Sequence, residues 1–203
     1  GVLSVVCVAW LSSSALAAGT AGRLRVGVKA DFAFGGELEV EIGRAEADDD
    51  LEATLGFALF GEYRVLRFLD LGFQAAFRWF NTESMDDNNV DANFMAALTP
   101  YAKLKYVFLR DAAEIYLMLP IGLALLSHSD DFEEVTGLEM KTGAGVNLGL
   151  FAGFGYRFFQ RLGAFVELGW DFHYVTGGIR GATDDYEYTT NQFGLKFGAF
   201  YCF

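Results

Sequence analysis

Residues 69–79 read LDLGFQAAFRW, with a large apolar residue or alanine at every second position. Successive side chains of a β-strand point to opposite faces, so this period of two predicts a strand with one oily face. The other face is small or polar and carries Asp70, Gly72, Gln74, Ala76 and Arg78. A soluble sandwich would hide its oily face and leave long charged side chains on the other. This pattern instead indicates a sheet whose oily face meets lipid.

The same alternation recurs seven more times, over residues 24–34, 51–63, 94–106, 114–125, 144–157, 162–174 and 192–203. An open sheet edge finds no hydrogen-bond partner in lipid, so these strands must close on one another. The predicted fold is therefore all-β, an eight-stranded antiparallel up-and-down transmembrane β-barrel. Pro100 and Pro120 fall inside predicted strands, where each removes a ladder hydrogen bond, and we expect a local bulge at each. Gly35-Gly36 is also expected to form a kink or bulge.

The first eighteen residues are apolar or small, carry no charge and run into Ala15-Leu16-Ala17. This pattern is typical of a secretory signal peptide and its cleavage site. We expect a signal peptide over residues 1–18, truncated at its start because no basic region precedes it, and a barrel over residues 19–203. Cleavage would leave Cys202 as the only cysteine, so the mature chain is expected to fold without an internal disulfide.

The last eight residues read KFGAFYCF and end on a terminal aromatic residue. The motif, formed by Lys196, Gly198, Tyr201 and Phe203, resembles the assembly signal of bacterial outer-membrane proteins. Together with the alternation, it makes residues 24–203 similar to the small eight-stranded barrels typified by the OmpA membrane domain, OmpX and OmpW. The resemblance implies a Gram-negative outer membrane, insertion by the barrel-assembly machinery, and contact with outer-membrane lipid and lipopolysaccharide. It implies location and fold more than activity.

The connections between the predicted strands alternate in length. Short ones lie near residues 64–68, 108–113 and 157–161, and long ones near 43–50, 81–91, 127–139 and 175–187. In outer-membrane barrels the short turns are periplasmic, so both termini are expected in the periplasm. The long connections hold sixteen acidic residues and only Arg44 and Arg180 as bases, in a chain of net charge -12. They could bind divalent cations loosely, whereas nucleic acid is not an expected partner.

The polar face of the predicted strands carries charged side chains that should meet inside the barrel. A buried charge without a partner is costly, so we expect a structural network of ion pairs there. Glu167 lies mid-strand, and we expect Arg157 or Lys196 as its partner. Glu167, Asp171 and His173 share one face, which is the pattern of an alternative metal or acid–base site. The expected network comprises Arg25, Lys29, Asp31, Glu52, Glu62, Asp70, Arg78, Lys103, Lys105, Glu114, Arg157, Glu167, Asp171, His173 and Lys196.

The expected function is a structural or surface-interaction role with a lumen filled by side chains. Eight strands leave an interior about wide enough for side chains alone. The large side chains predicted to fill it are Phe60, Phe80, Tyr101, Tyr116, Met118, Phe151 and Phe165. One alternative is a narrow channel for small or hydrophobic solutes, which needs a continuous lumen or a lateral gap.

A second alternative is a lipid A-modifying enzyme, for which Ser127-His128-Ser129 is the candidate motif. Adjacent residues of a strand point to opposite faces, and no third member of a triad is evident. We therefore expect no enzymatic activity and assign no catalytic residue, cofactor or metal site.

Overall fold

The computed structural model describes residues 24–43, 45–51, 53–80, 93–129, 138–181 and 185–203. The predicted signal peptide lies outside these residues, and so does Glu52 of the predicted charge network. Most of the predicted loops at 81–91 and 127–139 also lie outside them. The described residues contain no helix that is long and apolar enough to cross a membrane.

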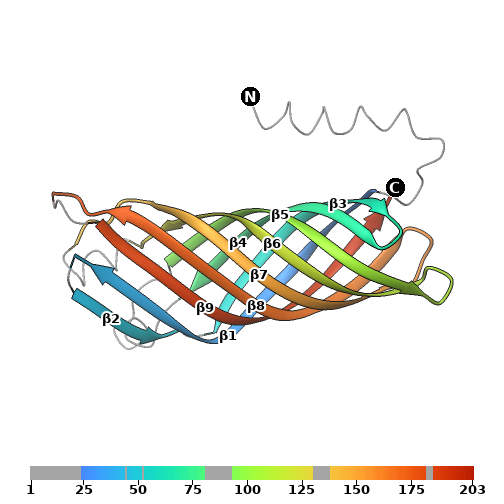
Figure 1. Ribbon diagram of the computed structural model, residues 1–203, viewed down its shortest axis with the longest axis horizontal. Coiled ribbons are helices and arrows are strands. Elements are labelled where there is room, and N and C mark those ends of the chain that lie inside the picture. Colours follow the sequence, from blue (N-terminus) through green and yellow to red (C-terminus); the bar gives the residue numbers. More distant parts are fainter. Residues whose placement is uncertain (1–23, 44, 52, 81–92, 130–137, 182–184) are drawn as a thin grey trace, which may run out of the picture.

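The described chain forms one antiparallel sheet that closes on itself (Figure 1). Its strands are β1 (Leu24–Ile42), β2 (Ala45–Asp50), β3 (Thr54–Leu66), β4 (Leu69–Phe80), β5 (Asn93–Phe108), β6 (Ala113–Ser127), β7 (Gly143–Arg157), β8 (Leu162–Gly178) and β9 (Asp185–Cys202). Strands β1 and β3 to β9 form the barrel wall, and pairing of β1 with β9 closes it. The predicted eight-stranded antiparallel barrel is confirmed. Strand β2 is an additional element that pairs with the end of β1.

A bulge divides β1 into two parts, and it reverses which alternate side chains point into the barrel. The register against β9 shifts between Phe34 and Gly36, and Gly35 lies at φ 60°. That left-handed conformation favours glycine, so the bulge predicted at Gly35-Gly36 is confirmed. A one-residue slip turns every following side chain to the other face. Phe34 is therefore exposed on the wall, whereas Leu38 is buried inside the barrel.

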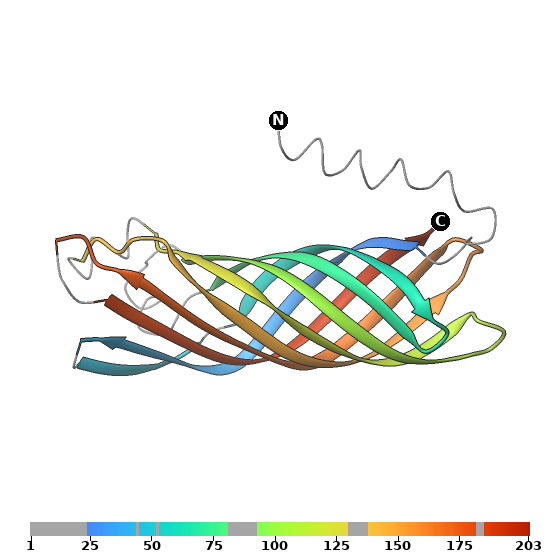
Figure 2. The same cartoon turned by 45° about the horizontal axis from the view of Figure 1, so that its top comes forward.

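The strands continue well into the regions that the sequence pattern assigned to long loops. β1 and β2 form a hairpin across 43–50, and β8 and β9 occupy most of 175–187, so the loop assignment was wrong in these two places. The extended strands project from one end of the barrel (Figure 2). The reason is the phase reversal, because Leu38, Val40 and Ile42 now turn their apolar side chains into the barrel. Leu51, expected on the lipid face, is also buried there.

The two prolines cause no bulge, which corrects the expectation from the sequence. β5 and β6 keep one register on both sides, with Leu98 opposite Leu123 and Tyr101 opposite Pro120. Pro100 lies between these pairs, where the ladder of β5 with β6 is interrupted. Pro120 pairs with Tyr101 in this ladder and instead lies where the ladder of β6 with β7 is interrupted, between Met118 and Ile121. The missing donors therefore change the register of neither ladder.

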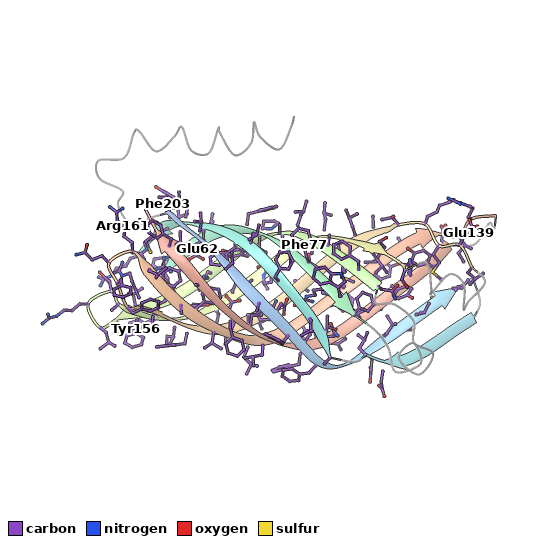
Figure 3. The ribbon with its side chains drawn as sticks, turned by 180° about the vertical axis from the view of Figure 1, so that it is seen from behind. Glu62, Phe77, Glu139, Tyr156, Arg161 and Phe203 are labelled. Atoms are coloured by element: carbon purple, nitrogen blue, oxygen red, sulfur yellow. The ribbon has the colours of Figure 1, made fainter. Side chains whose placement is uncertain are left out.

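The outer face of the wall is apolar and the inner face is polar or small. Large apolar side chains such as Leu104, Leu123 and Phe197 are about half exposed on the outside. Aromatic residues gather toward the ends, as Tyr106 and Phe158 do at the end that bears the short turns. Figure 3 shows Phe203, Arg161 and Tyr156 at this end and Glu139 at the other. A closed sheet with an oily exterior is the architecture of a transmembrane β-barrel.

Candidate functional site: the lumen

The lumen begins, at the end bearing the termini, with a layer of ion pairs around Arg25. Its guanidinium donates from Nη1 and Nη2 to the two oxygens of Glu114, at 2.5 and 2.8 Å, and from Nη1 to Glu62 at 3.2 Å. Lys105 pairs with Asp70 in the same layer. These five residues come from five different strands, and all of them are buried. The bidentate geometry makes the Arg25 pair strong and directional.

A second layer combines ion pairs with aromatic rings. Lys29 Nζ lies 3.0 Å from Glu167 Oε2, and the Tyr116 hydroxyl donates to Glu167 Oε1 at 3.0 Å. Lys103 Nζ lies 2.5 Å from Glu62 Oε2 and 4.4 Å from the centre of the Tyr116 ring. The rings and the charges therefore fill one cross-section together.

A third layer is organised by Arg78, which binds two carboxylates. Its Nε and Nη2 donate to Asp31 Oδ2 at 2.9 and 2.6 Å, and Nη2 also donates to Asp171. Lys196 Nζ lies 2.9 Å from Asp171 and 3.6 Å from Asp31. The Phe151 ring closes the layer, with its centre 3.7 Å from Lys196 Nζ. Two cations and two anions thus balance one another at buried positions.

Neutral polar side chains lie beyond the third layer. Gln192 donates to Thr54 at 2.8 Å, and Thr190 Oγ1 lies 3.3 Å from His173 Nδ1. A space of about 10 Å³ lies beside His173 at this level. It is about large enough for one water molecule.

The end of the lumen opposite the short turns is closed by an apolar cluster, which we call the outer plug. Its buried members are Leu38, Leu51, Phe80, Met95, Ala124, Leu126, Met140, Val175, Ile179, Tyr186 and Tyr188. His128 packs edge-on against Tyr186 and Tyr188, with ring centres 5.1 and 5.4 Å away. Burial lowers the pKa of His128 to about 4, so the imidazole is neutral at pH 7.

Ser127 and His128 do not form a catalytic pair in the described structure. Ser127 is exposed at the end of β6, whereas His128 is directed to the outer plug. The expectation that they face opposite ways is confirmed. The alternative site of Glu167, Asp171 and His173 is not assembled either. Both carboxylates are engaged by lysine or arginine, and the described residues contain no group of side chains able to hold a metal ion.

Glycines on the inner face make room for the aromatic rings. A Cβ at Gly153 would collide with the Tyr116 ring, and one at Gly72 with the Tyr101 ring. Gly163 and Gly198 stand in the same relation to Phe200 and Phe165. The sequence signal for this packing is glycine at inward positions of adjacent strands. These glycines let aromatic rings fill the lumen, because larger residues at the same positions would collide with the rings.

The structure corrects two details of the predicted network. Arg157 lies at the end of β7 and donates to the carbonyl of Asp111 at 2.9 Å, so it is not a member. Glu167 binds Lys29 instead of Arg157 or Lys196. Arg157 occupies an inward-facing position in the alternation of β7, but it lies at the end of the strand. Its side chain therefore reaches the turn between β5 and β6. Tyr101 and Tyr116 were expected only to fill space, and the structure adds their hydrogen bonds to Glu62 and Glu167.

The predicted assembly motif is divided between the two faces of β9. Lys196 lies in the third layer and Gly198 against the Phe165 ring. Tyr201 and Phe203 are exposed, with ring centres 5.0 Å apart. Arg161 donates to the Tyr201 hydroxyl at 3.1 Å. Only the two aromatic residues are therefore accessible from outside the barrel.

Fold and lumen together define a small transmembrane β-barrel with a filled interior. No protein-family model matches the sequence, and no curated protein is similar to it. Similar solved structures include the outer-membrane protein OprG from Pseudomonas aeruginosa, with 10% identity and a TM-score of 0.64 over 91% of this chain and 97% of that one.

Two further solved structures have the same fold. AlkL has 17% identity and a TM-score of 0.53 over 91% of each chain. Neisserial surface protein A has 12% identity and a TM-score of 0.52 over 91% of this chain and 99% of that one. Such identities show the fold and no shared activity. The chain therefore has the fold of the small eight-stranded outer-membrane β-barrels.

Proposed function

We propose that this protein is a non-conducting, non-enzymatic barrel that acts through its outer surface and anchors that surface in the membrane. The observation that carries the proposal is the filled lumen. Three layers of ion pairs and aromatic rings, with the outer plug beyond them, cross it in the described residues. A continuous water path would separate these charges. A channel for small solutes would have to remove several layers at once.

The proposed orientation places the three short turns, the start of β1 and the end of β9 in the periplasm. The long, projecting end of the barrel would then be extracellular, as in other outer-membrane barrels. Its described surface carries Glu37, Glu41, Asp50, Glu139 and Glu187, with Arg180 and Lys141 as the basic residues. A partner for this end would bring basic groups or bound divalent cations, which could bridge it to lipopolysaccharide.

The lipid A-modifying alternative finds less support. Ser127 faces outward and His128 packs among tyrosines, so a serine hydroxyl and an imidazole do not converge there. A triad needs that convergence before any question of pKa arises.

A planar-bilayer recording tests the sealed lumen. The purified wild-type barrel should give no conductance steps at a protein density at which an open porin, inserted in the same bilayer, gives many. As a control for insertion, the same sample should show heat-shifted migration in a gel. Regular steps from wild-type protein with intact folding would contradict the proposal and favour the channel alternative.

A further inference from the structure

The lipid-facing wall has a hollow of about 700 Å³ near the end that bears the short turns. It extends over β5 to β8, and at its centre lies Ala152, an exposed residue of β7 with a short side chain. Ligand sites in proteins commonly measure about 300–1,000 Å³. The taller side chains around it include Phe68, Leu104, Ile115, Leu117, Phe154 and Leu168. The groove is therefore apolar and large enough for a hydrocarbon chain.

A basic rim lies at the end of this groove. The three short turns contain five arginines and a single aspartate, Asp111. Arg67 precedes Phe68, which lines the groove, and the Phe68 carbonyl accepts a hydrogen bond from the Lys105 backbone at 2.9 Å. Arg67 and Arg110 are exposed, and Arg157 is half-buried.

The turn between β5 and β6 has a strained backbone that presents this rim. Leu109, Arg110 and Asp111 have φ angles of 51°, 55° and 66°, a left-handed run that non-glycine residues rarely adopt. Arg157 Nη2 donates to the Asp111 carbonyl at 2.9 Å and joins the end of β7 to this turn. Arg157 is thereby held beside the turn that carries Arg110, at the same end of the barrel as the groove. Such strain is typical of functional sites.

We propose that the groove and rim bind one anionic phospholipid of the periplasm-facing leaflet. One acyl chain would lie in the groove, and the phosphate would meet Arg67, Arg110 and Arg157, since guanidinium groups bind phosphate in bidentate fashion. A second copy of the chain fits less well, because a two-fold interface would bring the same arginines of both copies together. The leaflet assignment rests on the proposed orientation, whereas the site itself does not.

Native mass spectrometry in detergent tests the site without reference to orientation or conductance. Wild-type protein should retain one phosphatidylglycerol per monomer, about tenfold more than phosphatidylcholine with the same acyl chains. Ala152→Phe fills the groove and should abolish retention of both lipids. Combined Arg67→Gln, Arg110→Gln and Arg157→Gln should lower phosphatidylglycerol to the phosphatidylcholine level. Equal retention by wild type and Ala152→Phe, or a dimer without lipid, would overturn the proposal.

Matched controls come from the opposite end of the barrel. Ala144→Phe places the same ring on an exposed alanine of the same strand, and Arg180→Gln removes an exposed arginine. Both should retain phosphatidylglycerol as wild type does, and all variants should keep heat-shifted migration. The variant Gln160→Cys, in a Cys202→Ser background, should react with an impermeant maleimide only in permeabilised cells. Labelling in intact cells would overturn the leaflet assignment, while the retention data would still decide the site.

Discussion

The pair of Lys29 and Glu167 offers the most direct test of the lumen. Both side chains are almost fully buried, at 3% and 1% exposure, and their charged atoms lie 3.0 Å apart. We predict that Glu167→Gln destabilises the barrel more than Lys29→Met, and that the double variant costs less than either single change. The perturbation is nearly isosteric in both cases, so the effect on packing is small.

The magnitudes follow from the surroundings of each charge. At an effective dielectric constant of about 20, a pair 3 Å apart attracts by about 5 kcal/mol, partly offset by desolvation. Glu167→Gln leaves Lys29 opposite Ala58 and Gly198 on the two adjacent strands, and its remaining anionic neighbour, Asp31, is already paired with Arg78. We expect a loss of about 4 kcal/mol.

Lys29→Met should cost less, about 2 kcal/mol. Glu167 then keeps the hydrogen bond from Tyr116 and has Lys196 directly opposite in the register of β8 with β9. The double variant should lie within about 1 kcal/mol of wild type, because neither charge is left unpaired. The expected coupling energy is therefore about 5 kcal/mol, the sum of the two single losses minus the loss in the double variant.

The assay is equilibrium urea unfolding from micelles, followed by tryptophan fluorescence, with the slope of free energy against urea held as a check on two-state behaviour. The exposed pair of Arg180 and Glu139, at 74% and 58% side-chain exposure, is the control and should couple by less than about 1 kcal/mol. A buried coupling below about 1 kcal/mol, with unchanged slopes and intact folding, would refute the reasoning. A larger loss for Lys29→Met than for Glu167→Gln would refute the account of the surroundings.

Three further predictions concern packing, pH and assembly. Gly153→Val should destabilise the barrel by about 1–3 kcal/mol in the same urea assay, because the new side chain meets the Tyr116 ring. Since burial lowers the pKa of His128 from 6.5 to about 4, the unfolded chain binds the proton first. Stability should therefore fall as the pH drops from about 6.5 toward 4, and this fall should be smaller in His128→Phe than in the wild type; an equal fall in both would contradict the prediction. Deletion of Phe203 should reduce the amount of heat-modifiable barrel in the membrane, and unchanged levels would remove the terminal motif from the argument.

The fold could be predicted from the sequence because a period of two with small inner residues admits few other structures. Residues 69–79 show this plainly, with oily side chains that turn outward and Asp70, Gln74 and Arg78 that turn inward. Closure then follows from the need to satisfy the backbone in lipid. The alternation along each strand also places most charged residues on the inner face. It does not show which of these residues contact one another.

The pairings and the outer plug could not be predicted in this way. Lys29 and Glu167 are 138 residues apart and meet across the lumen, a contact that depends on shear and register. The sequence ELEVEI at 37–42 alternates like a solvated strand, and only the bulge at Gly35 turns its apolar side chains inward. Residues 43–50 were assigned to a loop because they lie between two predicted strands, whereas the reversed phase lets β1 continue to Ile42 and pair with β2.

The charge network and the sealed lumen are two aspects of one physical condition. Ion pairs in water couple by only about 0–1 kcal/mol, so a water-filled lumen would leave Lys29 and Glu167 almost uncoupled. Rings such as Phe151 and Tyr116, which need glycine opposite them, exclude that water and keep the local dielectric low. A large coupling energy would thus argue against conduction independently of any bilayer recording. If the pair couples strongly and the bilayer still conducts, the current must follow a path outside the layers described here.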